Sequence, residues 1–227
     1  MGDSINYPET DEDLSLHRTI FAPDLLKDKV VLVTGGGSGI GRATAWLAMR
    51  LGALVVIAGR SEEKLARTVG ETKHLTQGNP MVYRIMDIRD PDSVANVIDS
   101  VYDSIGKLDI LVNSAGGQFP QPAINFSEKG WRAVIDTNLN GTWNVMDYAA
   151  KKWQEKGSLG SIVNVVVVGQ GLHGIAHTVA ARAGVIAFAE KAAVEWAPYG
   201  IRVNCVAPGC IKTEGWKVYP ELVRARY

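Results

Sequence analysis

Short apolar runs alternate with longer segments of mixed polarity from residue 30 onward. The runs are almost continuously apolar and rich in β-branched residues, which is typical of strands buried on both faces of a parallel sheet. These predicted strands are Val30–Thr34, Leu54–Ala58, Met81–Asp87, Ile110–Val112, Ile162–Val168 and Arg202–Val206. The segments between them predict helices over Gly39–Leu51, Glu62–Leu75, Pro91–Ile105, Glu128–Trp153 and Thr178–Ala197. The alternation predicts an α/β fold with a doubly wound, mostly parallel sheet.

The segment before the first predicted strand has a different composition. Met1–His17 contains Asp and Glu residues but no Lys or Arg, which favours a solvated arm. No linker rich in Gly, Pro or Ser and no internal repeat divides the chain after it. We therefore expect an N-terminal arm over residues 1–25 and a single domain over residues 26–227.

Composition and charge exclude several functions. The 24 Lys and Arg residues balance 24 Asp and Glu residues, so generic nucleic-acid binding, which needs excess cations, has no support. No apolar run reaches the roughly 20 residues of a membrane span, and Met1–Glu12 lacks the regions of a secretory signal. Cys205 and Cys210 are too few for a disulfide framework. We expect a cytoplasmic protein that acts on a small molecule without a metal site.

A glycine-rich loop follows the first predicted strand directly. The strand Val30-Val-Leu-Val-Thr34 runs into Gly35-Gly-Gly-Ser-Gly-Ile-Gly41, and a helix is predicted to begin inside the loop. Glycine lets the backbone approach a ligand closely, and a helix N-terminus presents amides to an anion. This strand–loop–helix order indicates a Rossmann-type dinucleotide site. The loop residues expected to bind the cofactor are Gly35, Gly37, Ser38, Gly39, Ile40 and Gly41.

The end of the second predicted strand bears on which dinucleotide binds. An NAD site places an acid about 20 residues past the loop, where it bonds to the ribose hydroxyl. Gly59 and Arg60 stand at that distance in this chain. A guanidinium favours a 2′-phosphate through charge-assisted bonds, so we expect NADP(H) rather than NAD(H). The alternative is that Arg60 is an exposed charge paired with Glu62 or Glu63.

The sequence resembles the short-chain dehydrogenase/reductase family over roughly Leu26 to Thr213. The matching motifs are Thr34–Gly41, Asp87-Ile88, Asn113-Ser-Ala-Gly116, Asn138 within Thr-Asn-Leu-Asn-Gly, and Pro208-Gly209. The resemblance implies that Asp87 and Ile88 flank the adenine and that the Asn113, Ala115 and Gly116 run lies beside the cofactor. It also implies a carboxamide site formed by Pro208, Gly209, Ile211 and Thr213.

Further segments resemble particular branches of this family. Phe21–Leu26, Gly116–Phe119, Lys129–Trp131 and His177–Val185 are similar to peroxisomal trans-2-enoyl-CoA reductases and to bacterial citronellol or citronellal dehydrogenases. Dienoyl-CoA reductases share the Gly-Trp and asparagine elements. The resemblance also implies a homo-oligomer, either a dimer or a tetramer. Family members continue past the Pro-Gly turn to a seventh strand, so we expect a sheet that lacks this last strand.

The chain departs from the family at the catalytic positions. The family uses Ser, Tyr and Lys, with Tyr and Lys one helical turn apart. Thr178 stands at the tyrosine position and Arg182 at the lysine position, while Val166 or Val167 replaces the serine. Arginine stays charged and threonine does not ionise near neutral pH, so neither side chain relays a proton.

The remaining chemistry favours reduction of an enoyl thioester. Hydride addition to the β-carbon needs hydrogen-bond donors for the enolate oxygen, and the last proton can come through water. Two alternatives stay open: an alcohol or aldehyde dehydrogenase for terpenoid-like substrates, and a protein that binds NADP(H) without chemistry. A dehydrogenase would need a substitute base, for which His177 and His173 are candidates. The predicted catalytic residues are Asn138, Thr178, Arg182 and His177, and Arg182 is also expected to hold the cofactor ribose.

Overall fold

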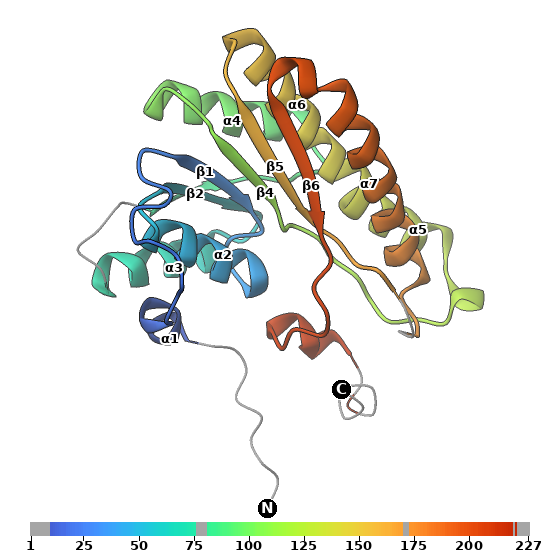
Figure 1. The fold of residues 1–227 in the computed structure, drawn as a ribbon. Coiled ribbons are helices and arrows are strands. Elements are labelled where there is room, and N and C mark those ends of the chain that lie inside the picture. The colour runs from blue at the N-terminus through green and yellow to red at the C-terminus, as the bar shows by residue number, and fades with distance from the viewer. Residues whose placement is uncertain (1–9, 76–80, 170–172, 220, 222–227) are drawn as a thin grey trace, which may run out of the picture.

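A six-stranded parallel sheet forms the centre of the computed structural model, which describes residues 10–75, 81–169, 173–219 and 221 (Figure 1). The strand order is β3-β2-β1-β4-β5-β6, and every neighbouring pair is parallel. Because the order reverses between β1 and β4, the predicted doubly wound topology is confirmed. The strands are β1 (Val30–Thr34), β2 (Leu54–Gly59), β3 (Met81–Ile85), β4 (Ile110–Asn113), β5 (Gly160–Val165) and β6 (Ile201–Val206).

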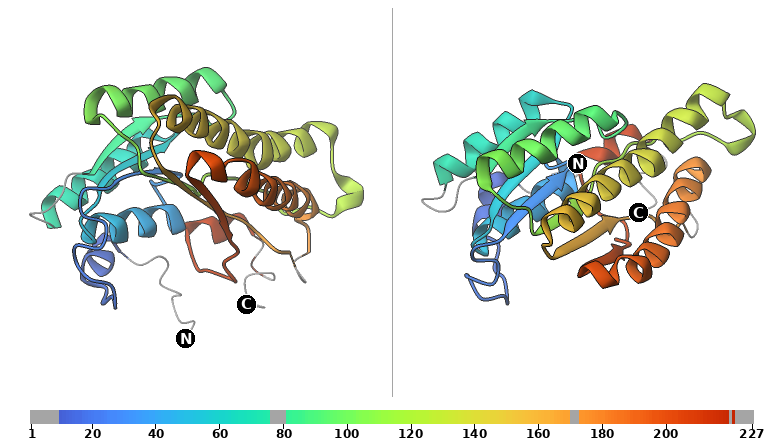
Figure 2. Two further views of the ribbon diagram at one scale, coloured as in Figure 1. Left: turned by 45° about the horizontal axis from the view of Figure 1, so that its top comes forward. Right: turned by 90° about the horizontal axis from the view of Figure 1, so that it is seen from above.

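Helices cover the sheet from both sides (Figures 1 and 2). One face carries α1 (Asp11–Leu16), α2 (Gly39–Arg50) and α3 (Glu62–Leu75), and the other carries α4 (Pro91–Ile105), α6 (Gly141–Lys156) and α7 (Ala176–Glu195). Alternation along β1 explains the two layers, since successive strand side chains point to opposite faces. Val31 and Val33 pack with α2 and α3, whereas Val30 and Leu32 pack with α4 and α6.

The long helix predicted from Glu128 is interrupted. The structure has α5 (Glu128–Ile135), a π-helical turn η2 (Asp136–Asn140) and then α6. The apolar positions on either side of η2 predicted one continuous helix, although four of the five residues of η2 are polar. Short 3₁₀ turns are η1 (Ala123–Asn125), η3 (Ala197–Tyr199) and η4 (Glu214–Val218).

The predicted solvated arm is wrong for the part that forms α1. Leu14 is buried in the core with α2 and α3, and Asp11 is buried against Arg42 and Trp46. Asp11 thus gains partners that compensate for its lost hydration, which a local count of acidic residues cannot reveal. Residues 1–9 lie outside the described part of the chain.

Strand β6 lies at one edge of the sheet, and no strand follows it among the described residues. None of the helices in the described ranges is both long and apolar enough to cross a bilayer.

Candidate active site

The glycine loop joins β1 to α2 at the carboxyl edge of the sheet. Gly35 and Gly39 have positive φ values of 71° and 52°, which favour glycine. A Cβ at Gly35 would lie 2.9 Å from the backbone of Ala115, and one at Gly41 would overlap the carbonyl oxygen of Gly35. Glycine at these positions therefore lets α2 and the end of β4 approach the loop closely.

This loop borders a cleft of about 470 Å³ at the switch point between β1 and β4. The cleft brings together most of the residues predicted to bind a cofactor. These are Gly35, Gly37, Ser38, Gly39, Ile40, Arg60, Asp87, Ile88, Ala115, Gly116, Arg182, Pro208, Gly209 and Thr213. The predicted residues that do not line it are Gly41, Asn113, Ile211, Asn138, His177 and Thr178.

Two cations border the part of the cleft that lies at the start of α3. Arg60 and Lys64 are both exposed and line the cleft together with Ser61. Neither cation forms an ion pair among the described residues, and Glu62 instead accepts a hydrogen bond from the Tyr83 hydroxyl at 3.2 Å. The alternative of Arg60 pairing with Glu62 or Glu63 is therefore not formed.

Asp87 and Ile88 form the wall beside this basic part. The Arg89 side chain donates to the Asp87 carboxylate at 2.9 Å, and this bond lowers the pKa of Asp87 to about 2. Asp87 therefore carries a full negative charge at neutral pH. Ile88 is buried, and the Asn144 side chain holds its carbonyl oxygen at 2.9 Å.

Asn113 lies behind the cleft rather than on its surface. Its buried side-chain amide donates to the Oδ1 of Asn164 at 3.0 Å. The bond joins the ends of β4 and β5, whose residues Asn113 and Asn164 face each other in the sheet. Asn113 is thus placed to fix the spacing of the strands that flank the cleft.

Asn138 is committed to the backbone around the π-helical turn. It is buried, and its Nδ2 donates to the carbonyl oxygens of Gly117 at 2.6 Å and Val134 at 3.0 Å. Its Oδ1 accepts from the Gly117 amide at 3.3 Å. The side chain therefore ties η2 to the loop that follows β4.

Arg182 reaches the cleft from α7 and is 95% buried, with a relative exposure of 5%. Its guanidinium donates to the Ala115 carbonyl at 3.0 Å, to the Thr142 hydroxyl at 3.2 Å and to the Asn138 carbonyl at 3.4 Å. Burial lowers the pKa of Arg182 to about 10, so it remains protonated at neutral pH. The side chain thus supplies a fixed positive charge.

Thr178 and His177 lie outside the cleft, in a buried cluster at the start of α7. The His177 Nδ1 accepts from the Thr178 amide at 2.8 Å. The imidazole stacks on Phe126 at 4.4 Å and meets the edge of Phe119 at 4.7 Å. Burial lowers the pKa of His177, although the carbonyls of Ile175 and Phe119 oppose the shift. His173, the other imidazole considered, is exposed.

The wall opposite α2 is apolar and is completed by the segment after β6. Val165, Val166 and Val167 line the cleft where the family places its serine. Pro208, Gly209 and Thr213 continue the same wall. Ile211 instead borders an adjoining cavity of about 580 Å³ between α1, α2 and this segment, and Pro208 and Thr213 line both spaces. Among the described residues that line the cleft, the titratable side chains are Arg60, Lys64, Asp87 and Arg182.

The sequence did not predict several residues that line this cleft, which are Gly59, Ser61, Lys64, Leu65, Met86, Ser114, Thr137, Val165 and Gly215. Lys64 could have been found, because it stands four residues after Arg60 at the start of a predicted helix. Ser114 and Thr137 both lie inside quoted motifs, whereas Gly215 carries no local signal.

The fold and cleft define a dinucleotide-binding α/β protein. A family model described as short chain dehydrogenase matches residues 29–221. The chain belongs to the short-chain dehydrogenase/reductase family, whose members are oxidoreductases with a nicotinamide cofactor. The predicted family is therefore confirmed.

Similar proteins carry several names. The chain is 39% identical to the peroxisomal 2,4-dienoyl-CoA reductase of Danio rerio over 92% of its length and 70% of that protein. It is 37% identical to a probable 2,4-dienoyl-CoA reductase of Bacillus subtilis over 84% of its length and 75% of that protein. The structure of a citronellol catabolism dehydrogenase from Pseudomonas aeruginosa is 40% identical with a TM-score of 0.78, covering 84% of this chain and 78% of that one. A variant of actinorhodin polyketide ketoreductase with NADPH is 32% identical with the same TM-score of 0.78, covering 84% of this chain and 74% of that one.

Proposed function

We propose that this oxidoreductase uses NADPH to reduce the carbon–carbon unsaturation conjugated to the carbonyl of an enoyl-CoA or dienoyl-CoA thioester. The observation that carries the proposal is the composition of one end of the cleft, lined by Val165, Val166, Val167 and Arg182 and called the reacting end below. That end combines apolar valines with the fixed charge of Arg182, and none of the described residues lining the cleft is a Tyr, His or Cys. Such an end can stabilise negative charge but offers no side chain that would accept a proton from an alcohol.

The cleft fits a nicotinamide dinucleotide. Glycine at 35 and 41 lets α2 and the end of β4 pack closely against the loop. Ser38, Gly39 and Ile40 line the cleft at the N-terminus of α2, where the Gly39 amide donates to Glu214 at 3.0 Å. These groups would hold a pyrophosphate. Asp87 and Ile88 would flank the adenine, and Pro208, Gly209 and Thr213 would hold the carboxamide.

Arg60 and Lys64 support NADPH over NADH. Both cations line the cleft without an ion pair among the described residues, so both can meet a 2′-phosphate. A phosphate between two such cations gains charge-assisted hydrogen bonds that a ribose hydroxyl does not. The ketoreductase with NADPH shares the fold at 32% identity, which supports the same choice.

The bound nicotinamide would supply a hydride to the β-carbon of an enoyl thioester, or to the δ-carbon of a 2,4-dienoyl thioester. Arg182 would add positive potential on the side of the cleft where an enolate oxygen gains negative charge. Val165, Val166 and Val167 would pack against the acyl chain and exclude water from one side. The α-carbon would take its proton from water, so that one enoyl thioester, one NADPH and one proton yield one saturated thioester and NADP⁺. A dienoyl thioester would yield one enoyl thioester and NADP⁺ in the same way.

Relatives named 2,4-dienoyl-CoA reductases at 37% and 39% identity support this substrate class. The test mixes the 227-residue protein with NADPH and trans-2-enoyl-CoA or 2,4-dienoyl-CoA of short, medium and long acyl chains. We expect NADPH absorbance to fall and a reduced thioester to appear by mass spectrometry. NADPH binding without consumption for every chain length would contradict the proposal.

The citronellol catabolism dehydrogenase, at 40% identity, supports a second candidate function, oxidation of a terpenoid-like alcohol or aldehyde. This reaction needs a base, and the nearest imidazole, His177, is buried between Phe119 and Phe126. Incubation of the protein with NADP⁺ and citronellol tests it. NADPH formation that His177→Ala abolishes and Thr178→Val preserves would favour the alcohol reaction.

A homo-oligomer through α6 and α7 also belongs to the proposal. Trp143 on α6 is 46% exposed beside Phe188 of α7, and the two residues border a small cavity of about 130 Å³. An exposed tryptophan next to a pocket is typical of an interface. Trp131 is also partly exposed, whereas Trp153 is fully buried in the core.

Cys205 and Cys210 are both free, which fits a reducing compartment such as the cytoplasm.

A further inference from the structure

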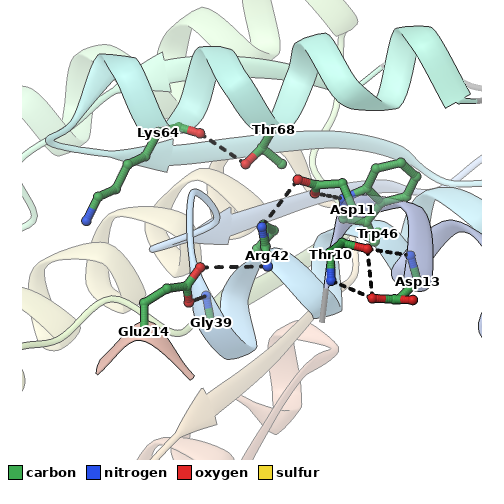
Figure 3. Close-up of polar contacts among 9 residues, drawn as sticks. All are labelled: Thr10, Asp11, Asp13, Gly39, Arg42, Trp46, Lys64, Thr68 and Glu214. Carbon is green, nitrogen blue, oxygen red and sulfur yellow. Dashed lines mark hydrogen bonds and ion pairs between the residues drawn. The ribbon is translucent and has the colours of Figure 1, made fainter. Parts of the chain in front are cut away.

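Three charged side chains from distant parts of the chain meet at the first turn of α2 (Figure 3). Arg42 lies in this turn and is 6% exposed. Its Nη1 contacts the Asp11 carboxylate at 3.2 Å, and its Nη2 lies 3.7 Å from the Glu214 carboxylate. Asp11 comes from α1 and Glu214 from η4, so one guanidinium joins the two ends of the described chain.

Glu214 also caps the helix that carries the glycine loop. Its Oε2 accepts from the Gly39 amide at 3.0 Å, while the side chain of Ser38, the residue at the N-cap position, makes no capping bond. A carboxylate at a helix N-terminus satisfies an unpaired amide and interacts favourably with the helix dipole. Glu214 therefore caps α2 in place of the Ser38 side chain.

The cap has a direct consequence for the cleft wall. Thr213 and Gly215, the neighbours of Glu214, line the cleft, whereas Glu214 does not. A Cβ at Gly39 would lie 3.4 Å from the Thr213 side chain, so the two segments are in close contact. The Glu214 carboxylate thus positions the turn 213–218 without lining the cleft itself, and Thr213 and Gly215 form the cleft surface.

Helix α1 fixes the other side of Arg42. The Asp11 carboxylate also accepts from the Trp46 indole at 2.6 Å, which fixes the rotation of Asp11 toward α2. Leu14 anchors the helix in the core, and a capping box between Thr10 and Asp13 closes its first turn. Because α1 packs on both α2 and α3, it braces the two helices that frame the cofactor cleft.

From these contacts we infer that Glu214 is a positioning residue of the cofactor site. Its bond to the Gly39 amide holds the turn 213–218 against the N-terminus of α2. Helix α1 contributes to this contact through Asp11, which fixes the position of Arg42, the second partner of Glu214. The inference rests on the proposed dinucleotide site. It assigns the N-terminal helix a role in cofactor affinity, although α1 contributes no residue to the cleft.

The test measures NADPH dissociation constants by calorimetry and steady-state kinetics on the full chain. Glu214→Ala should weaken NADPH binding about tenfold, because the Gly39 amide loses its acceptor and the turn 213–218 loses its bond to α2. Glu214→Gln keeps an acceptor for the Gly39 amide and should recover most of that loss. Asp11→Asn keeps an acceptor for Trp46 but loses the charge facing Arg42, and should weaken binding about threefold. All three should change the KM for NADPH more than kcat.

Matched controls are Glu12→Gln, an exposed acid of the same helix, and Lys217→Gln, an exposed cation of the same turn. Both should bind NADPH as the wild type does. Unchanged binding in Glu214→Ala and Asp11→Asn would overturn the inference, and so would tighter binding, because Glu214 would then compete with the cofactor. If Glu214→Ala does not fold, the NADPH dissociation constants of Glu214→Gln and Asp11→Asn are compared with those of the controls. Values equal to the controls would then overturn the inference. A wild type that binds neither nucleotide would instead reject the proposed function.

Discussion

The two ends of the cleft use their charged side chains in opposite ways. At the nucleotide end, Arg60 and Lys64 are exposed and form no ion pair among the described residues. At the reacting end, Arg182 is buried and its guanidinium is bonded to three protein acceptors. The first end therefore has cations free to meet a ligand, whereas the second uses its cation to hold its own walls together.

This difference limits the chemistry of the reacting end. Asn138 and Arg182 join η2, α7 and the loop after β4 in one bonded unit. Such a unit fixes the position of charge, but a guanidinium with a pKa of about 10 does not exchange protons near neutral pH. The reacting end is thus suited to stabilising an anion while a proton comes from solvent.

Arg182→Met should have the largest effect. The substitution leaves the Ala115 carbonyl, the Thr142 hydroxyl and the Asn138 carbonyl without their donor, at a cost of about 3 kcal/mol in the free energy of unfolding. Urea unfolding measures the loss. The control is Arg202→Met, an exposed arginine, which should change stability by less than about 0.5 kcal/mol. Equal midpoints for the two variants would remove the claim that Arg182 holds the reacting end together.

Gly116→Ala tests the same unit from inside the cleft. A Cβ at Gly116 would overlap the Arg182 guanidinium and lie 2.7 Å from the Asn138 Oδ1. We expect a loss of about 2 kcal/mol in stability from overpacking, together with lower turnover. Gly117→Ala is the matched control, because a Cβ there meets nothing within 4 Å. If Gly116→Ala behaves like Gly117→Ala, the bonded unit is looser than the contacts indicate.

The nucleotide end was predictable from the sequence because its signals are local. The loop Gly35–Gly41 and Arg60 each follow a strand in a short continuous run. The reacting end was less predictable because its bonds span the chain. Arg182 bonds to residues 40, 44 and 67 positions away. No local pattern indicated that its donors would be used internally, or that His177 would pack against Phe119 and Phe126.

The N-terminal helix illustrates the same limit. Its acidic composition favoured a solvated arm, yet Asp11 bonds to Arg42 and Trp46, 31 and 35 positions later. A short helix is marginal alone and depends on tertiary contacts. The alternating apolar runs, by contrast, predicted every strand of the sheet, because burial on two faces leaves a strong pattern.

Substitution at the basic part of the cleft sharpens the comparison at the nucleotide end. Arg60→Ala should weaken NADPH binding about tenfold, or about 1.4 kcal/mol, and Lys64→Gln somewhat less, because each removes one cation from the 2′-phosphate. NADH binding should not change for either variant. Calorimetry with both nucleotides checks this, and Arg67→Ala, an exposed arginine of α3 outside the cleft, is the control. Equal losses for NADPH and NADH would mean that these cations serve the pyrophosphate instead.

His177 should produce the smallest effect, through pH. Burial lowers the pKa of His177 from its ordinary value of 6.5, so the unfolded chain binds a proton at a higher pH than the folded protein. Wild-type stability should therefore fall as the pH drops from about 7 through 6.5 and toward the lowered pKa. His177→Phe keeps an aromatic ring between Phe119 and Phe126 and should flatten this fall. Urea unfolding at pH 5 and pH 7.5 measures it, with exposed His74→Phe as control.

Activity of the same variant separates a packing role for His177 from a catalytic one. His177 lies outside the cleft, so His177→Phe should retain enoyl-CoA turnover within about threefold, with the pH profile of turnover unchanged. The lost bond from the Thr178 amide accounts for a small destabilisation of about 1 kcal/mol. Loss of turnover with retained stability would mean that the imidazole reaches the substrate after all. The reacting end would then contain a group that exchanges protons. The contrast between free cations at the nucleotide end and a single bonded, fixed charge at the reacting end would no longer hold.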